Sequence, residues 1–298
     1  MSAEEVAPQS LASGILAANS HRRKEVIGAD VLSSGRERRS QRISEWPQVS
    51  VIIPTLNEAL NIPHVLAAIP SCVHEVVIVD GLSTDGTPEV VSEARSDAKI
   101  VYQTRRGKGD ALRCGFEAAT GDILVMMDAD GSADPEEIPA FIEALLAGAD
   151  FAKGTRFCPG GGSEDITPLR SVGNRVLSGT VNVLFRTDYS DLCYGYNAFW
   201  RHCLPAMCVD CSGFEVETLI NIRIARAGLA ISEVPSFERE RMHGQSNLRT
   251  FRDGGRVLRT YRNDPLVPIC CQVIRAKENF SSASWLRGFF DQRISSAR

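Results

Sequence analysis

The chain has 298 residues, of which 43% are hydrophobic, and a formal net charge of −4. This is enough apolar material for one catalytic-sized domain with appendages, and it excludes an intrinsically disordered protein. No apolar run reaches the ~18 residues that a membrane-spanning helix needs. The first ten residues, MSAEEVAPQS, start acidic and do not have the pattern of a secretory signal, so we expect a cytoplasmic protein.

Charge is distributed unevenly along the chain. Residues 48–248 carry 16 Lys and Arg against 27 Asp and Glu, whereas residues 249–298 carry 10 against 4. The acidic middle argues against nucleic acid as the main partner. The basic end fits either a contact with anionic lipid or a solvated helix.

Apolar runs and helical patterns alternate in the first half of the chain. Residues 1–47 lack periodicity and are expected to form a mobile leader. Strands are then expected at 49–53, 75–80, 99–103 and 122–128, and helices at 59–69, 87–95, 109–119 and 135–146. Apolar strands separated by helices indicate an α/β fold, in which a mostly parallel central sheet has helices on both faces.

The second half continues less regularly, as far as residue 262. The pattern predicts a strand within 150–157, a glycine-rich loop at 158–165, an amphipathic helix at 168–185, a short strand or turn at 191–200, a helix at 213–228 and a strand within 230–240. Residues 263–298 form a basic tail with Trp285, Leu286, Phe289 and Phe290 at helical spacing. The tail fits either an interfacial helix at a membrane surface or a helix packed on the domain.

Polar motifs follow the first four predicted strands. They are PTLNE at 54–58, VDGLSTDGT at 79–87, GKGDALRCG at 107–115 and DADGS at 128–132. Ligands of parallel α/β sheets bind at the carboxyl ends of the strands. The four motifs are therefore expected to line one cleft.

The DAD motif has the most direct chemical interpretation. Side chains two residues apart on a strand face the same way, so Asp128 and Asp130 can point into one site. Carboxylate oxygens suit Mg²⁺ or Mn²⁺, and such an ion usually keeps positions open for phosphate oxygens. An isolated D-x-D is more often a solvated turn, and the three accompanying motifs are what favour a metal site here.

In order and spacing, the four motifs resemble those of the inverting nucleotide-sugar glycosyltransferases of family 2. Within that family they are most similar to dolichol-phosphate mannose synthases and bacterial polyprenyl-phosphate sugar transferases. The resemblance covers residues 49 to about 260. It implies an A-type, Rossmann-like glycosyltransferase fold over residues 48–262, with a nucleotide-sugar half at 48–148, an acceptor half at 149–262, and Mg²⁺ or Mn²⁺ as cofactor.

By the same resemblance, the motifs after the first two strands would hold the nucleoside. Pro54, Thr55 and Glu58 would do so from the first motif, with Glu58 accepting hydrogen bonds from the base or ribose. Asp80 would bind the nucleoside from the second. Gly81 stands where the family has a second aspartate, which leaves the choice between UDP and GDP open.

The resemblance also implies groups for the phosphates and the metal. Asp128 would contact the ribose and the metal, and Asp130 would be the principal metal ligand. Lys108, between two glycines at a helix start, fits either an approach to the nucleotide or a solvated turn. Arg156, in GTR, matches an arginine that would neutralise phosphate through two parallel hydrogen bonds.

A later segment, RMHGQSNL, matches the R-x-x-G-x-S segment that these synthases place over the donor phosphates and the acceptor. It adds Arg241, His243 and Ser246 to the candidates. The histidine is equally well explained as structural.

The need for a general base depends on the acceptor. A phosphate acceptor is already ionised, whereas a hydroxyl acceptor has to lose a proton. Asp191, Glu215 and Glu217 are the candidates for this base. The two glutamates lie at a predicted helix start, where carboxylates also favour the helix dipole, so a capping role is an equal alternative.

Three functional hypotheses follow from the sequence. The leading one is transfer of a sugar from a UDP- or GDP-linked donor to a polyprenyl phosphate, at the cytoplasmic face of a membrane that the tail contacts peripherally. The second is the same donor chemistry on a soluble hydroxyl acceptor, such as a natural-product intermediate or phosphoglycerate. The third is a protein that binds nucleotide sugars without turnover. A nucleotidyltransferase is disfavoured, because PTLNE occupies the place of its glycine-rich loop.

Overall fold

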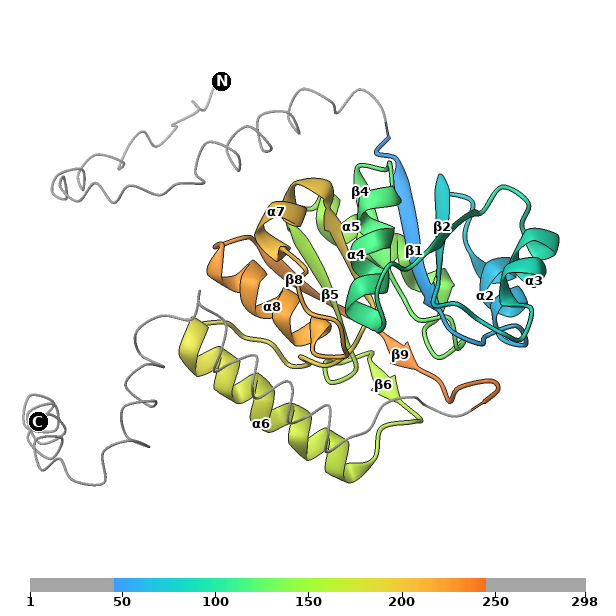
Figure 1. The fold of residues 1–298 in the computed structure, drawn as a ribbon. Helices are drawn as coiled ribbons and strands as arrows, with labels where there is room; N and C mark the ends of the chain where they lie inside the picture. Colours follow the sequence, from blue (N-terminus) through green and yellow to red (C-terminus); the bar gives the residue numbers. More distant parts are fainter. Residues whose placement is uncertain (1–45, 245–298) are drawn as a thin grey trace, which may run out of the picture. The chain divides into compact units, whose positions relative to one another are not determined.

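The computed structural model describes residues 46–244 (Figure 1). Ser246, the predicted tail and nearly all of the predicted leader lie outside this range. The strands are β1 (Val49–Thr55), β2 (Glu75–Asp80), β3 (Lys99–Tyr102), β4 (Ile123–Met126), β5 (Phe151–Thr155), β6 (Gly162–Ser163), β7 (Asn197–Trp200), β8 (Ile231–Pro235) and β9 (Phe237–Glu238). The helices are α2 (Ile62–Ala68), α3 (Thr87–Ala94), α4 (Lys108–Ala118), η1 (Pro135–Glu137), α5 (Ile138–Leu146), α6 (Pro168–Phe185), η2 (Arg201–Cys203), α7 (Leu204–Met207) and α8 (Val216–Arg226).

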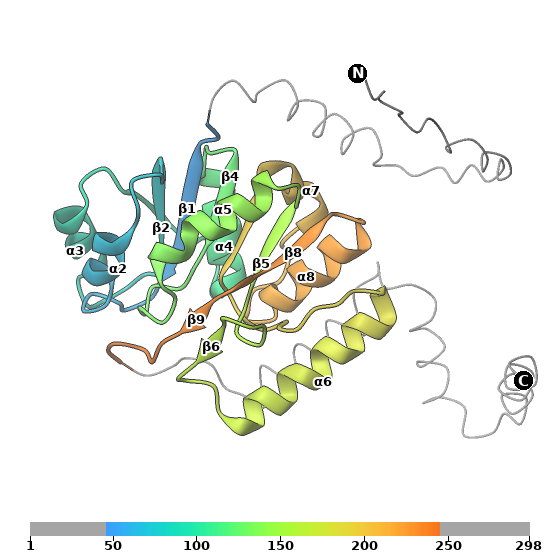
Figure 2. The same ribbon diagram turned by 180° about the vertical axis from the view of Figure 1, so that it is seen from behind.

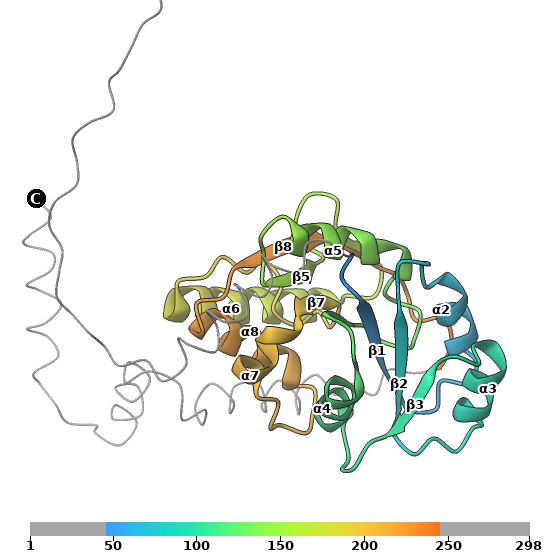
Figure 3. The same cartoon turned by 90° about the horizontal axis from the view of Figure 1, so that it is seen from above.

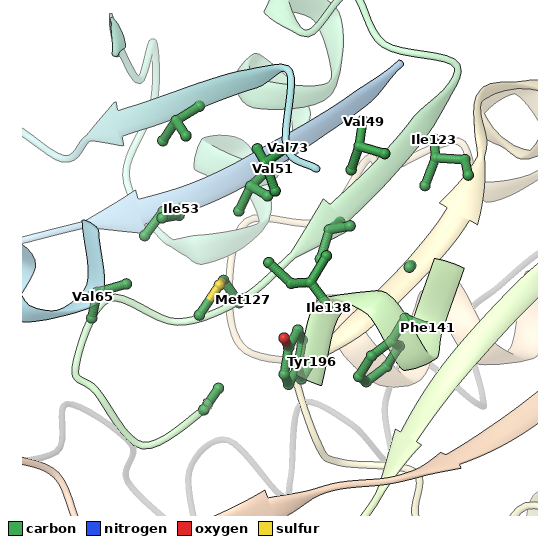
Figure 4. Close-up of a cluster of buried hydrophobic side chains, with 14 of the residues drawn as sticks. Val49, Val51, Ile53, Val65, Val73, Ile123, Met127, Ile138, Phe141 and Tyr196 are labelled. Atoms are coloured by element: carbon green, nitrogen blue, oxygen red, sulfur yellow. The ribbon is translucent and has the colours of Figure 1, made fainter. Parts of the chain in front are cut away.

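A seven-stranded sheet organises the described residues, with the strand order β3-β2-β1-β4-β7-β5-β8. Helices α2 and α5 lie on one side of it and α4 and α7 on the other (Figure 3). Because side chains alternate along a strand, Val49, Val51 and Ile53 of β1 point into the core under α2 and α5 (Figure 4). The expected α/β fold with a mostly parallel sheet is confirmed. No helix in residues 46–244 is both long and apolar enough to span a membrane.

One strand of the sheet, β7, runs against the others. This strand pairs antiparallel with both β4 and β5, whereas the other neighbouring pairs are parallel. The chain reaches β7 from the edge where β4 and β5 end, so the strand has to run back through the sheet. Its direction brings the residues just before Asn197 to the carboxyl ends of its neighbours.

Strand β4 is shorter than predicted and ends at Met126. Asp128 and Asp130 therefore lie in the turn after the strand, and strand alternation does not determine where they point. Gly131 has a φ of 77° in this turn, a conformation that glycine adopts without strain. The expectation that both aspartates face one site depends on this turn.

Helix α4 approaches the sheet closely at Gly115. A Cβ at this position would overlap Ile52 Cγ2 and lie 2.9 Å from Val79 Cγ2. Both neighbours are fully buried strand residues, so they have little room to move.

We predict that Gly115→Ala destabilises the protein by about 1–3 kcal/mol, because the extra methyl group overpacks the contact between helix and sheet. The free energy of unfolding in urea measures this effect. Gly179→Ala is the matched control, because Gly179 also lies inside a helix but has no atom within 4 Å of an added Cβ. The control should be stabilised by about 0.5–1 kcal/mol; equal effects of the two substitutions would contradict the packing explanation.

Candidate active site

A pocket of about 630 Å³ opens at the carboxyl ends of β1 and β4. Parts of the predicted motifs after β1, β2, β3 and β4 line it, together with α6, the start of α8 and the residues after β9. Asp80, Asp191 and His243 are not among the lining residues. The residues selected from the sequence that do line the pocket are Pro54, Thr55, Glu58, Lys108, Asp128, Asp130, Arg156, Glu217 and Arg241.

Lys108 joins two carboxylates on one wall of the pocket. Its Nζ lies 2.5 Å from Asp128 Oδ1 and 2.6 Å from Glu217 Oε1. Burial alone would lower the pKa of Lys108. The charges of Asp128 and Glu217 and the hydrogen bonds to them outweigh burial, so the pKa lies above its ordinary value. Burial, together with the charge of Asp128, raises the pKa of Glu217 although Lys108 opposes this. Of the two roles considered for Lys108, the solvated turn is wrong: the side chain is 11% exposed and doubly ion-paired.

The glycines beside Lys108 explain how it enters the pocket. Gly109 N donates to Ser212 O at 3.2 Å. A Cβ on Gly107 or Gly109 would overlap the backbone carbonyl groups of Ser212 or Cys211. Gly107 also has a φ of 109°, in the region that favours glycine. The start of α4 therefore packs directly on the loop that leads into α8, and α8 carries Glu217.

Arg241 joins a second pair of carboxylates from two different strand ends. Its Nη1 donates to Glu58 Oε1 at 2.9 Å, and its Nη2 lies 3.1 Å from Asp130 Oδ2. Burial would lower the pKa of Arg241, but Glu58 and Asp130 raise it. The predicted nucleoside contact and the predicted metal ligand are thus held by one guanidinium group.

The segment around Arg241 lies across the DAD turn. Arg239 N donates to Ser132 O at 2.8 Å, and Met242 N donates to Asp130 O at 3.2 Å. A Cβ on Gly131 would lie 2.6 Å from Met242 Sδ, so a larger residue at this position would have to displace the Met242 side chain. His243 is exposed, and only its backbone is used here, because His243 O accepts a hydrogen bond from Asn61 Nδ2 at 3.1 Å.

Arg156 is buried and already paired. Its Nε donates to Asp191 Oδ2 at 2.7 Å, its Nη2 to Asp191 Oδ1 at 3.1 Å, and its Nη1 to Glu238 Oε2 at 2.9 Å. The bidentate geometry that the sequence suggested for phosphate is therefore made with Asp191. The guanidinium still lines the pocket and has donors left over, since it carries five N–H groups.

This pairing argues against Asp191 as a general base. Burial would raise the pKa of Asp191, but the charge and hydrogen bonds of Arg156 hold it below its usual value. A carboxylate that is fully buried, paired and absent from the pocket wall positions Arg156 instead. Glu215 accepts a hydrogen bond from Gly213 N and does not line this pocket. Among the three candidates, Glu217 is the one on the pocket wall.

The predicted nucleoside end contains one buried oxygen without a partner. Asp80 Oδ2 accepts from Ser83 N at 2.9 Å, whereas Asp80 Oδ1 is buried and unpaired within residues 46–244. A Cβ on Gly81 would lie 3.3 Å from Gln103 Nε2. Gln103 lines the pocket beside the place where the family has its second aspartate. Gln103 was not among the predicted site residues, because it falls at the end of an otherwise apolar strand pattern.

The DAD carboxylates fit a divalent cation. Asp128 is 38% exposed on the pocket wall, and Asp130 offers Oδ2 toward Arg241 while its Oδ1 accepts from Ser132. These are hard oxygen donors, which suit Mg²⁺ or Mn²⁺. Within the described range no cluster of three or more His, Cys, Asp or Glu side chains could hold a metal.

Two further residues support the site and were not selected from the sequence. A Cβ on Gly195 would lie 3.1 Å from both Lys108 Nζ and Glu217 Oε1, so the backbone before β7 touches the ion-paired cluster. Lys153 is fully buried in β5, and its Nζ donates to Tyr194 O at 2.7 Å and to Gly154 O at 2.9 Å. Periodicity could not reveal either one, because each role depends on a neighbour distant in the sequence.

Comparisons with known proteins agree with this geometry. A family model described as glycosyl transferase family 2 matches residues 50–214. Glycosyltransferase AglJ of Haloferax volcanii is 33% identical over 229 residues, which cover 73% of this chain and 74% of that protein. Polyprenol monophosphomannose synthase of Mycolicibacterium smegmatis is 34% identical over 212 residues, which cover 66% of this chain and 80% of that protein.

A solved structure shares the fold. Glucosyl-3-phosphoglycerate synthase from Mycobacterium tuberculosis, in complex with Mn²⁺, UDP and glucosyl-3-phosphoglycerate, aligns with a TM-score of 0.59 and 23% identity. The alignment covers 84% of this chain and 88% of that one.

We predict that Lys153→Met changes how stability depends on pH. Burial lowers the pKa of Lys153 to about 8, from 10.5. Between these pH values the unfolded chain binds the proton that the folded protein has lost, so the contribution of Lys153 to stability rises with pH. The stability advantage of Lys153→Met over the wild type should therefore be largest below pH 8 and shrink toward pH 10.5. Urea unfolding across this range, with refolding at pH 7 as the control for reversibility, measures it; parallel profiles would contradict it.

Proposed function

The chain belongs to family 2 of the glycosyltransferases, and on this premise we propose that it transfers a sugar from a nucleoside diphosphate sugar to a polyprenyl phosphate. The observation that carries the proposal is the pocket in which Asp128 and Asp130 are matched by cations from two distant segments. Such a site suits a ligand that brings both a metal ion and a diphosphate. The metal ion would then pair with the aspartates and the diphosphate with Lys108 and Arg241, so that no charge is left unpaired.

The donor would bind across the ends of β1, β2 and β4. Glu58, which lines the pocket, would accept hydrogen bonds from the nucleoside, and Asp80, which is buried off the pocket wall, would support this end of the site through the hydrogen bond that it accepts from Ser83 N. Asp128 and Asp130 would hold Mg²⁺ or Mn²⁺, which would stabilise negative charge on the leaving diphosphate. Arg241 and Lys108 would add preorganised positive charge on either side of the same group.

The acceptor would enter from the side of α6. Its oxygen would attack the anomeric carbon while the bond from that carbon to the nucleoside diphosphate breaks. Ile166, Leu169 and Leu177 make this part of the pocket apolar. Arg156 and Arg170 line it with guanidinium N–H groups, and each is ion-paired with carboxylates of the protein, Arg170 with Asp165 at 2.9 Å. A polyprenyl phosphate combines an apolar chain, which suits the apolar residues, with an anionic phosphate, which suits the guanidinium groups. The Mycolicibacterium relative is named as a polyprenol monophosphomannose synthase.

A soluble hydroxyl acceptor is the second candidate, favoured by Glu217. Burial raises the pKa of Glu217, and the side chain lines the pocket, as a general base must. The structural neighbour is described as a complex with a phosphoglycerate product, which is not a lipid. A location at the membrane surface, through the predicted tail or another contact, belongs to the lipid proposal alone.

We predict metal-dependent transfer of radiolabelled sugar from UDP or GDP donors into butanol-extractable lipid. EDTA should abolish it, and Asp130→Asn should lower the rate by about a hundredfold or more, because a weakened metal site loses several kcal/mol of charge stabilisation. Asp97→Asn is the matched control, because Asp97 is exposed and distant from the pocket wall. Label confined to the aqueous phase, beyond donor hydrolysis, would instead establish the soluble acceptor.

We predict that Glu217→Gln separates the two acceptors. The amide keeps a hydrogen-bond acceptor for Lys108 but cannot take a proton. Transfer to a phosphate acceptor should therefore fall by less than about tenfold, whereas loss of a general base for a hydroxyl should cost about 10²–10⁴-fold. Glu215→Gln, two residues earlier, is the control. A large loss with a polyprenyl phosphate acceptor would contradict the base-free mechanism.

A further inference from the structure

The ends of β1, β2 and β3 lie next to one another at one end of the pocket. Strand β2 lies between the other two, and Figures 2 and 3 show β1 and β2 side by side. Backbone pairing continues one residue beyond β2 and β3, because Gly81 N donates to Thr55 O at 2.8 Å and Gln103 N donates to Asp80 O at 3.1 Å. Thr55, Leu56, Gly81 and Gln103 line the pocket here, and we call this part the nucleoside end.

The side-chain amide of Gln103 is free to bind a ligand at the nucleoside end. Gly81 has no side chain, Leu56 is apolar, and Thr55 Oγ1 donates to Val79 O. A Cβ on Gly81 would lie 3.3 Å from both Gln103 Nε2 and Leu56 Cδ1, so the amide lies directly beside the backbone of Gly81. Within residues 46–244 no hydrogen bond joins this amide to another residue. It therefore offers both a donor and an acceptor, and rotation of the amide exchanges their places.

The carboxylates near the nucleoside end are already engaged in the described part of the chain. Glu58 Oε1 and Oε2 lie 2.9 and 3.2 Å from Arg241 Nη1, and Oε2 also accepts from Asn61 Nδ2 at 2.5 Å. Arg241 contacts Asp130 as well, which places Glu58 beside the DAD turn. Asp80 is buried off the pocket wall. The other carboxylates that line the pocket follow β4 or later strands, and they are Asp128, Asp130, Asp165, Glu217, Glu238 and Glu240.

Uracil and guanine need different partners for their hydrogen-bonding edges. Uracil has one N–H donor between two carbonyl oxygens, and an amide can pair with this N–H and one carbonyl at the same time. Guanine has N1–H and the N2 amino group side by side, and a carboxylate can accept from both. An amide that pairs with guanine O6 and N1–H leaves the amino group without an acceptor. A buried N–H without a partner is costly, whereas a carbonyl with an unused lone pair is tolerated more easily.

We propose that Gln103 reads the base of the donor and makes the pocket select UDP over GDP. The inference rests on the proposed function and narrows its donor from the two nucleotides that the sequence left open to one. Gln103 Oε1 accepts from N3–H of uracil, and Nε2 donates to a neighbouring carbonyl oxygen of the base. Gly81 allows this contact, because the amide of Gln103 packs where a side chain at position 81 would begin.

Isothermal titration calorimetry of the full-length protein with UDP and with GDP, each in the presence of Mn²⁺, tests the proposal. The wild type should bind UDP about tenfold or more tightly than GDP, because one unpaired polar group is enough for a change of this size. The titration needs neither an acceptor nor turnover. Binding of neither nucleotide would defeat the proposed function, whereas binding of GDP in preference to UDP would defeat the assignment of Gln103 alone.

We expect Gln103→Glu to reverse the preference. The carboxylate can accept from guanine N1–H and the amino group together, but its lone pairs face a carbonyl oxygen of uracil. The readout is the ratio of the Kd for GDP to the Kd for UDP, because the added charge also weakens the binding of either diphosphate. This ratio should fall by about a hundredfold, from tenfold in favour of UDP to tenfold in favour of GDP.

Two further variants separate hydrogen bonding from shape and charge. Gln103→Leu keeps a side chain of similar size without hydrogen-bonding groups, so it should weaken UDP about tenfold without strengthening GDP. Gln48→Glu is the matched control for charge, because Gln48 is exposed, precedes β1 and does not line the pocket. Its ratio of Kd values should equal that of the wild type.

Two results would overturn the proposal. One is a wild type that binds GDP as tightly as UDP or more tightly. The other is a Gln103→Glu variant that keeps the wild-type ratio of Kd values, since the base would then be read by groups other than Gln103.

Discussion

The candidate site depends on one electrostatic constraint: the carboxylates at the strand ends have to be neutralised by cations from other parts of the chain. Lys108 serves Asp128 and Glu217, while Arg241 serves Glu58 and Asp130. Removing one partner of a buried pair typically costs about 3–5 kcal/mol, because the remaining charge stays uncompensated. Each cation joins segments far apart in the sequence, so the pocket wall combines residues from both ends of the described range. The same pairing keeps the carboxylates balanced before any ligand arrives.

Local physics made much of the fold predictable. Strand β2 and helix α6 have the predicted bounds, since a continuous apolar run ends at Asp80, and Thr167 caps a helix that Pro168 begins. Thr167 Oγ1 accepts from Arg170 N at 3.3 Å, as a capping side chain should. Convergence of the four motifs also followed from sequence, because parallel strands bring their carboxyl ends to one edge.

The remaining features depend on partners that leave no periodic signal. Lys108 and Glu217 are 109 residues apart, and nothing in either motif identifies the other. Asp191 was a candidate general base until the geometry placed it on Arg156. The direction of β7 was also not predictable, because the pattern of a four-residue strand does not show whether the strand pairs parallel or antiparallel with its neighbours. Glycines at 107 and 109 suggested room for a nucleotide, whereas in the structure they make room for the backbone of another loop.

The position of β7 fixes the distance between the ends of β4 and β5 in the site. Strands β4 and β5 lie on either side of it, so their ends are two strand spacings apart, about 9.5 Å. Asp128 follows one end and Arg156 the other, and the residues leading into β7 fill the interval, with Gly195 beside Asp128 and Tyr194 under Arg156. Backbone hydrogen bonds between the strands fix this distance. Substitutions in the loops above the sheet can therefore change the shape of the site while they leave the distance between the two strand ends unchanged.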